Sequence, residues 1–205
     1  MRAIVTIIIF SFSISATGQI RDTVFKNQIK LSVFRIADPS NPGIELNYER
    51  SHSRKFSSEL TIAYMDNIVR SGNYFEGFRV GFEEKRFLKT RIQDTRVYLS
   101  SQLVYNNSSL KHVDNYGYDS STRTYINAPF RIQKQTISVN VKIGIEFFLG
   151  HFVLDYYTGL GVKYREIKHI DRKYPFPESR GWNFNFEGSS WNINLPGSIK
   201  FGYCF

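Results

Sequence analysis

The feature that most constrains the fold is a two-residue alternation of apolar and polar side chains that recurs along most of the chain. In Thr136–Phe148 ("TISVNVKIGIEFF"), apolar side chains occupy every odd position, and polar or small residues occupy the even positions up to Glu146. Successive side chains of a strand point to opposite faces, whereas a helix repeats every 3.6 residues. The alternation therefore predicts a long β-strand with one apolar face and one polar face.

Seven further segments show the same period, which gives eight predicted strands in all. They are 28–34, 43–50, 56–64, 77–85, 96–105, 151–165 and 195–205. The longer ones exceed the usual five or six residues of globular strands. No stretch between them has a convincing helical period. The pattern indicates an all-β protein.

The connections between these strands alternate between short and long. Segments 51–55, 87–94 and 149–151 are short, whereas 66–74, 106–131 and 168–190 are much longer; only 37–42 is brief on the long side. Short turns at one rim and long loops at the other are typical of outer-membrane barrels. A β-sandwich has no reason to sort its loops in this way.

The polar face carries many charges of both signs. Its predicted members are the cations Lys30, Arg79, Lys85, Arg96, Lys142, Lys163, Arg165 and Lys200, and the carboxylates Glu45, Glu49, Glu59, Glu83, Glu146 and Asp155. Eight strands enclose a lumen just wide enough for side chains to fill, and buried charges require partners. We therefore expect a polar network that plugs the lumen, while the other face, almost free of charge, contacts lipid.

The predicted fold is thus a closed, eight-stranded, antiparallel, up-and-down transmembrane β-barrel, with short periplasmic turns and longer extracellular loops. In this arrangement the C-terminal segment closes the barrel against the first strand, so that no strand edge remains in lipid. The alternation places Tyr203 and Phe205 in a periplasmic aromatic girdle. A general diffusion pore is not expected, since open channels have about 16–18 strands.

The first residues have a different character. In "MRAIVTIIIFSFSISATGQI", Arg2 precedes an apolar stretch that is too short to cross a bilayer, and Ala16 and Gly18 follow at small-residue positions. We predict a cleaved signal peptide at 1–18, a periplasmic segment at 19–26 and a barrel domain at 27–205. The single cysteine, Cys204, cannot form an internal disulfide.

Two blocks, Ile29–Tyr64 ("IKLS … IELNYERS … FSSELTIAY") and Ser198–Phe205 ("SIKFGYCF"), carry a family resemblance. The chain resembles the small eight-stranded outer-membrane barrels of the OmpA/OmpX-like superfamily, and more narrowly a barrel family of Bacteroidota-type bacteria. The resemblance implies a location in the cell outer membrane. The implied partners are outer-membrane lipid and lipopolysaccharide, and the outer-membrane assembly machinery during biogenesis.

The same resemblance implies a C-terminal assembly signal at Ser198, Tyr203 and Phe205. In such signals a polar residue is followed two positions later by glycine and then by alternating aromatic or apolar residues that end in Phe. Lys200 stands here where the glycine is expected, and Gly202 lies nearby.

The sequence gives little indication of chemistry. The formal charge is +9, yet the basic residues are spread along the chain, so we expect no nucleic-acid partner. His52 and His151 fall in short turns, His112 and His169 in long loops, and no pair has metal-ligand spacing. We predict no metal, no cofactor and no enzyme activity.

Several alternatives remain open at this point. A lipid-A acyl hydrolase or acyltransferase would need a loop serine with His112 or His169, and a secreted lipocalin-like protein would turn its apolar face inward. The aromatic loops suit recognition of an extracellular glycan or protein, although Trp182, Phe184, Phe186 and Trp191 fit an outer aromatic belt better. We favour a monomeric barrel with a structural or surface-interaction role.

Overall fold

The computed structural model describes residues 25–32, 43–66, 74–90, 92, 94–119, 121, 123–174 and 186–205. The predicted signal peptide at 1–18 lies outside the described residues, as do Trp182 and Phe184. No helix in the described part of the chain is long and apolar enough to cross a bilayer.

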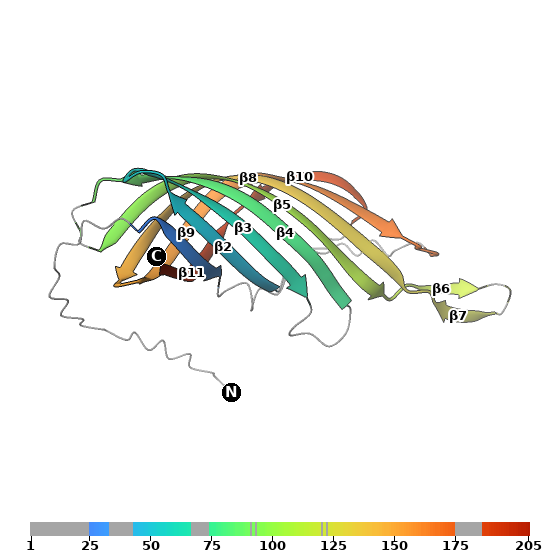
Figure 1. Ribbon diagram of the computed structural model, residues 1–205. Helices are drawn as coiled ribbons and strands as arrows, with labels where there is room; N and C mark the ends of the chain where they lie inside the picture. The colour runs from blue at the N-terminus through green and yellow to red at the C-terminus, as the bar shows by residue number, and fades with distance from the viewer. Residues whose placement is uncertain are drawn as a thin grey trace, which may run out of the picture.

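The described residues form strands that run in long antiparallel pairs (Figure 1). The strands are β1 (Asn27–Ser32), β2 (Gly43–Ser51), β3 (Phe56–Asp66), β4 (Tyr74–Leu88), β5 (Thr95–Val113), β6 (Tyr116–Asp119), β7 (Thr124–Asn127), β8 (Phe130–Leu149), β9 (Phe152–Ile170), β10 (Gly188–Asn194) and β11 (Gly197–Cys204). Each strand of the ring β1-β2-β3-β4-β5-β8-β9-β11 pairs with its neighbours, and β11 pairs back with β1. The predicted closed, antiparallel, eight-stranded barrel is confirmed.

The last strand closes the barrel, as the alternation of its side chains predicts. Ile29 of β1 lies opposite Tyr203 of β11. The amide of Phe205 donates to the carbonyl of Asn27 at 2.9 Å, and the amide of Asn27 donates back at 3.1 Å. On its other side β11 pairs with β9, as does β10. β10 and β11 thus form one strand interrupted at Pro196, which has no N–H to donate.

The connections between strands differ between the two ends of the barrel. Segments 52–55, 89–90 and 150–151 lie at the same end as Asn27 and Phe205, whereas the strand ends Ser32, Gly43, Asp66, Tyr74, Val113, Phe130, Ile170 and Gly188 lie toward the opposite end. In Figure 1 the first end is at the left, and the β6–β7 hairpin projects at the right beyond the barrel. We call these ends the short-turn rim and the long-loop rim.

Several strands run further toward the long-loop rim than the sequence predicts. β5 and β8 extend into the expected loop 106–131, which also holds the β6–β7 hairpin, and β9 and β10 extend into the expected loop 168–190. His112 and His169 therefore lie in strands β5 and β9 and not in loops. In these extensions the apolar outer row ends, so the pattern used to recognise the strands is lost.

Between the two rims the apolar rows face outward on every strand of the ring. Examples are Ile29, Leu46, Ile62, Val80, Leu103, Val141, Leu160 and Phe201, one from each strand, all of them exposed. Val141, for instance, is 63% exposed, whereas its neighbours Asn140 and Lys142 are buried inside. The lipocalin-like alternative is wrong, because its apolar rows would face inward.

Aromatic side chains border this apolar zone on the outer surface. Toward the long-loop rim they form an upper ring, Tyr64, Phe78, Tyr105, Tyr164 and Trp191, and toward the short-turn rim a lower ring, Tyr48, Phe56, Phe147, Phe152, Tyr203 and Phe205. Ring centroids lie 5.2 Å apart for Tyr164 and Trp191 and 5.6 Å apart for Phe152 and Phe201. We call the zone between the two rings the belt.

Toward the short-turn rim the outer surface also carries polar side chains. The Ser58 hydroxyl donates to Glu84 at 2.6 Å, and the His52 ring nitrogen Nε2 lies 2.6 Å from the same hydroxyl. Such a change from apolar through aromatic to polar side chains is typical of a membrane–water interface.

Above the upper ring the inner face of the strands carries the apolar side chains and the outer face carries the polar ones. Buried Val113, Phe130, Ile132 and Ile167 pack together on the inner side, while polar residues such as Glu166 and Lys168 face outward and pair at 3.0 Å. We call the upper ends of β5, β8 and β9 the crown. The crown thus has polar residues on its outside and buries its apolar residues within, an arrangement that the sequence analysis does not predict.

Candidate functional site

The lumen has three layers, and β8 shows their order. Its inward side chains are apolar at Phe130 and Ile132, polar from Lys134 to Asn140, and charged at Lys142 and Glu146. The layers are the apolar cluster of the crown, a central cavity and an ion cluster near the short-turn rim. Because alternate residues of a strand point inward, one strand contributes to all three.

Two lysines lie at the centre of the ion cluster. The Nζ atom of Lys30 lies 2.6 Å from Glu49, 2.8 Å from Glu146 and 2.8 Å from Asp155. The Nζ atom of Lys85 lies 2.7 Å, 3.2 Å and 2.9 Å from the same three carboxylates. Each ammonium group therefore satisfies its donors with charged acceptors, which give the stronger hydrogen bonds.

Further ion pairs surround this centre. Lys200 donates to Glu59 and Lys142 donates to Glu83, while the Arg96 guanidinium lies 2.6 Å from Glu146. The cluster contains the cations Lys30, Lys85, Arg96, Lys142 and Lys200 and the carboxylates Glu49, Glu59, Glu83, Glu146 and Asp155. These numbers balance, so the cluster is formally neutral.

Neutrality explains how so many charges can be buried. Removing a single ion from water costs several kcal/mol, which only partners of opposite charge offset. Glu49, Glu146 and Asp155 lie close enough together to hold a metal ion, but the two ammonium groups already fill the space between them. We therefore interpret this layer as a salt plug.

Small residues make room for the plug. A Cβ on Gly144 would lie 2.3 Å from the ring of Tyr98, whose hydroxyl donates to Asp155 at 2.7 Å. A Cβ on Gly202 would lie 2.7 Å from Cγ of Lys30. The narrow lumen accommodates large polar side chains only because glycine stands beside them.

Aromatic rings cover the plug toward the short-turn rim. The Arg96 guanidinium lies 4.1 Å from the ring centroid of Phe87 and 4.6 Å from that of Phe148. Phe25 stacks on Phe148 with centroids 6.4 Å apart. These contacts are within the range of favourable cation–π and aromatic pairs, and they separate the ion cluster from this rim.

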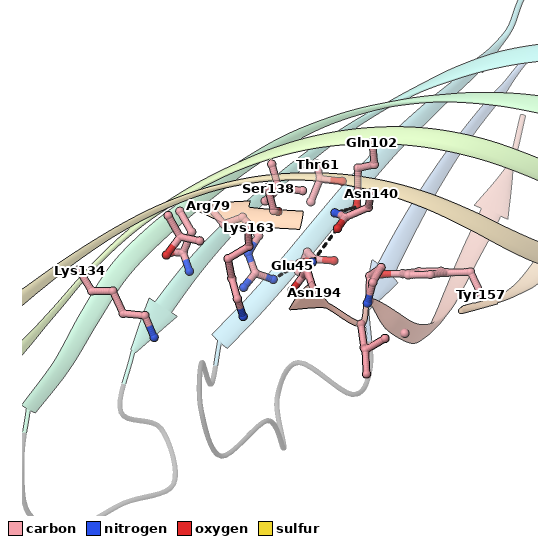
Figure 2. Close-up of a pocket in the computed structure, with 16 residues that line it drawn as sticks. Glu45, Thr61, Arg79, Gln102, Lys134, Ser138, Asn140, Tyr157, Lys163 and Asn194 are labelled. Carbon is pink, nitrogen blue, oxygen red and sulfur yellow. Dashed lines mark hydrogen bonds and ion pairs between the residues drawn. The ribbon is translucent and has the colours of Figure 1, made fainter. Parts of the chain in front are cut away.

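The central cavity lies on the other side of the plug and has a volume of about 260 Å³. Figure 2 shows its polar lining, in which Asn194 donates to Asn140 at 2.6 Å. Glu45 is the one carboxylate among the described residues of the lining. It accepts from Arg79 at 3.2 Å and from the Ser32 hydroxyl at 2.6 Å.

The structure places the predicted lumen residues as follows. Lys30, Glu45, Glu49, Glu59, Arg79, Glu83, Lys85, Lys142, Glu146, Asp155 and Lys200 are buried, and Arg96, Lys163 and Arg165 are partly buried. The ion cluster gathers most of these, whereas Glu45, Arg79 and Lys163 line the cavity. Their role as one network across the whole lumen stays a prediction.

Two lumen residues, Tyr98 and Lys134, are not predicted from the sequence. Tyr98 lies on the polar face, but the predicted lumen network contains only charged residues and therefore leaves it out. Lys134 lines the cavity but falls between the predicted loop 106–131 and the predicted strand 136–148. Continuing the alternation of Thr136 and Ser138 by two residues was the signal that could have found it.

The predicted C-terminal signal residues are divided between the lumen and the outer surface. Ser198 is buried in the lumen, and Tyr203 and Phe205 are exposed on the outer surface. Lys200, which stands in place of the expected glycine, belongs to the plug and pairs with Glu59. The departure from the family pattern thus has a structural reason in this chain, while the assembly role of these residues stays a prediction.

The crown histidine His169 has neighbours that do not suit a nucleophile-activating base. A catalytic histidine has one ring nitrogen on a serine and the other on a carboxylate. The Nδ1 atom of His169 lies 2.8 Å from the Arg172 guanidinium and 3.9 Å from Glu187, and its ring packs on Phe130. His112 is exposed. These contacts do not support the hydrolase alternative.

Comparison with known proteins gave one structural likeness. No family model matches the chain, and no curated protein matches it. Among solved structures it is similar to Neisserial surface protein A, with 12% sequence identity over 87% of this chain and 94% of that chain and a TM-score of 0.42. The barrel assignment rests on the strand pairing of this chain itself.

Proposed function

We propose that the protein is an integral outer-membrane barrel with a side-chain-filled lumen and a structural or surface-interaction role. The observation that carries this proposal is the belt, in which the apolar rows of every ring strand are exposed. In water such a surface would be far larger than the apolar patches of soluble monomers. In lipid it is the surface that a barrel requires.

The dimensions of the belt support the same proposal. On β8 the apolar outer row runs from Ile137 to Phe147, which matches the about 9–11 residues of a tilted transmembrane strand. Aromatic rings border it at both ends, as they do at membrane interfaces.

The plug supports a structural role in preference to free diffusion. Lys30, Lys85, Glu49, Glu146 and Asp155 are fully buried and bonded to one another, so they fill the lumen at that level. In this proposal the barrel carries its function on the long-loop side.

The projecting β6–β7 hairpin supports a surface-interaction role. Its Tyr116, Tyr118 and Tyr125 are exposed at 65%, 54% and 78%. The hairpin is anchored where Asn115 Nδ2 donates to the carbonyl of Tyr174 at 3.1 Å. Exposed tyrosines on an anchored hairpin suit contact with an extracellular glycan or protein.

The remaining parts of the proposal follow from the sequence. Segment 1–18 directs export, residues 19–26 lie in the periplasm, and Ser198, Tyr203 and Phe205 are read by the assembly machinery. The mature chain is a monomer that contacts lipopolysaccharide and belongs with the Bacteroidota-type barrels.

Membrane fractionation combined with gel mobility tests this proposal. We expect the protein in the outer-membrane fraction, extracted only by detergent, and expect unboiled samples to migrate faster than boiled ones because a closed barrel resists cold detergent. Recovery in the soluble periplasmic fraction, with no effect of boiling, contradicts the proposal.

A further inference from the structure

We propose that a hollow on the outer surface of β4, β5 and β8 binds the phosphate of a lipid headgroup whose acyl chains lie against the belt. The inference rests on the proposed membrane location and adds to it a class of lipid and the place where that lipid binds. It depends on the position of this outer hollow, on an arginine without a described partner, and on a buried serine hydroxyl.

The outer hollow lies at the border between the belt and the crown and has a volume of about 550 Å³. Tyr64 and Phe78 of the upper aromatic ring line its lower part. Two residues further along the strands, Glu76, Ser109 and Gln133 stand next to one another on β4, β5 and β8, which run side by side in Figure 1. Aromatic side chains below and polar side chains above match the boundary between acyl chains and headgroups.

A small side chain and a bent strand form the hollow. Ser109 stands between the longer side chains of Glu76 and Gln133. Next to it, the register of β5 against β8 shifts between Leu110 and Val113, and a bulge of this kind bends its strand. The outer surface is therefore indented at Ser109, where a larger side chain would fill the space.

Arg131 supplies the charge that selects an anion. It lines the hollow on its crown side, is exposed, and has no ion-pair or hydrogen-bond partner among the described residues. The other charged residue of the described lining is Glu76, whose carboxylate is offset by the Nζ atom of Lys111 at 2.6 Å. A guanidinium group binds phosphate through two parallel N–H donors, so Arg131 suits a headgroup phosphate.

The hydroxyl of Ser109 points to a ligand independently of the charge. Its Oγ atom is buried and has no hydrogen-bond partner among the described residues, which is uncommon in proteins. Because serine has three staggered rotamers, this hydroxyl can turn into the hollow and donate to a phosphate oxygen. The amide side chains of Asn107 and Gln133 line the same space and suit the remaining oxygens of the headgroup.

The position of the hollow favours a lipid over a free phosphate. Below its two aromatic rings, the next outward residues of β3 and β4 are Ile62 and Val80, which lie opposite each other and are exposed. A phosphate held at Arg131 therefore places the acyl chains of its lipid on the apolar surface of the belt. A free phosphate has no group that uses this surface.

Native mass spectrometry of the refolded full-length barrel, released from detergent micelles, tests the proposal. The probes are dioleoyl phosphatidic acid, which carries a phosphate monoester, and dioleoylglycerol, which has the same chains without the phosphate. We expect phosphatidic acid to bind with an apparent Kd about tenfold lower, because only its phosphate accepts charge-assisted hydrogen bonds. Equal binding of the two lipids overturns the proposal.

Two substitutions separate the charge of the hollow from its shape. Arg131→Gln removes the cation, whereas Ser109→Leu fills the space and keeps every charge. Each should raise the apparent Kd for phosphatidic acid about fivefold, since the first removes the phosphate donors and the second excludes the headgroup. Gel mobility of unboiled samples shows that each variant still forms the closed barrel.

Arg86→Gln is the matched control, because Arg86 is also an exposed arginine of the outer face but lies near the short-turn rim and outside the hollow. It should change the Kd less than about twofold, as expected for a screened surface charge. If neither Arg131→Gln nor Ser109→Leu raises the Kd beyond that of Arg86→Gln, the proposal is overturned.

A competition arm separates a lipid site from a site for free phosphate. Ammonium phosphate is added to the complex with phosphatidic acid, and ammonium acetate at equal ionic strength is the reference because salt screens charges. A lipid site retains phosphatidic acid equally in both salts, whereas displacement by phosphate alone overturns the lipid assignment. A barrel that fractionates with the outer membrane but binds both lipids alike keeps its proposed location and loses only this site.

Discussion

The belt and the crown belong to the same strands but place their apolar side chains on opposite sides. On β9, Leu160 and Val162 of the belt are exposed on the outer surface, whereas Ile167 of the crown is buried within. In the proposed membrane location, the apolar cover of the belt and the polar cover of the crown correspond to a change from lipid to water at the upper aromatic ring. Alternation decides which residues of a strand share a face. What surrounds each part of the strand decides which of the two faces is apolar.

The largest expected effect comes from a substitution on the inner side of the belt. Glu146→Leu removes the carboxylate that contacts Lys30 at 2.8 Å and Arg96 at 2.6 Å, which leaves buried cations in excess. Breaking a buried pair in this way costs about 3–5 kcal/mol. We expect that loss in the free energy of unfolding, measured by urea titration of the barrel in lipid vesicles.

Ile145→Leu is the matched control for that change, because it alters the neighbouring residue on the outer side. Ile145 belongs to the outward apolar row, where an aliphatic exchange should cost less than about 1.5 kcal/mol. Equal losses in the two variants contradict the assigned facing of β8.

The next effect concerns the inner side of the crown. Ile167 is 1% exposed and packs with Val113, Phe130 and Ile132, so Ile167→Ala leaves a cavity and should cost about 2–4 kcal/mol. The loss is measured by the same urea titration. Its control, Lys168→Ala, changes the outer side and should stay within about 0.5 kcal/mol. A crown that tolerates both changes equally is not packed as described.

A charge placed on the outer surface compares the two regions directly. Val141→Arg puts a cation in the middle of the belt and should cost about 2–4 kcal/mol in lipid. Gln133→Arg puts the same cation on the outer side of the crown, where water solvates it, and should have little effect. Similar losses at the two positions in the vesicle titration argue against a change of surroundings at the upper aromatic ring.

The sequence predicts the belt well and the crown poorly, for one physical reason. Alternation with an outward apolar row identifies Ile137, Val139 and Val141 as outward strand residues of the belt, and their polar neighbours as lumen residues. Before Ile137 the outer row consists of Gln135 and Gln133, so the apolar alternation that predicts the strand is absent there. Phe130 and Ile132 point inward, so in this part of β8 the apolar residues lie on the inner face and the polar residues on the outer face.

The same limit applies to the candidate site. The charged residues of the plug can be predicted from the alternation, since Lys142 and Glu146 fall on the inner face of a regular strand. Their partners cannot, because Lys30 and Asp155 meet only when the barrel closes. The cavity is missed for a further reason, because Lys134 lies in a part of β8 that precedes the predicted strand 136–148.

The smallest expected effect concerns how tightly side chains pack on the inner side of the belt. Gly144→Ala would bring a Cβ to 2.3 Å from the Tyr98 ring, which must move away from Asp155, and overpacking of this kind costs about 1–3 kcal/mol. Gly81→Ala is the matched control, because a Cβ there would lie 3.4 Å from Thr61 and needs little adjustment. We expect urea titration to show a loss of stability for the first variant and almost none for the second. If the two variants unfold at the same urea concentration, the plug is less tightly packed around Tyr98 than its contacts indicate, and the belt would then tolerate inner changes as readily as outer ones.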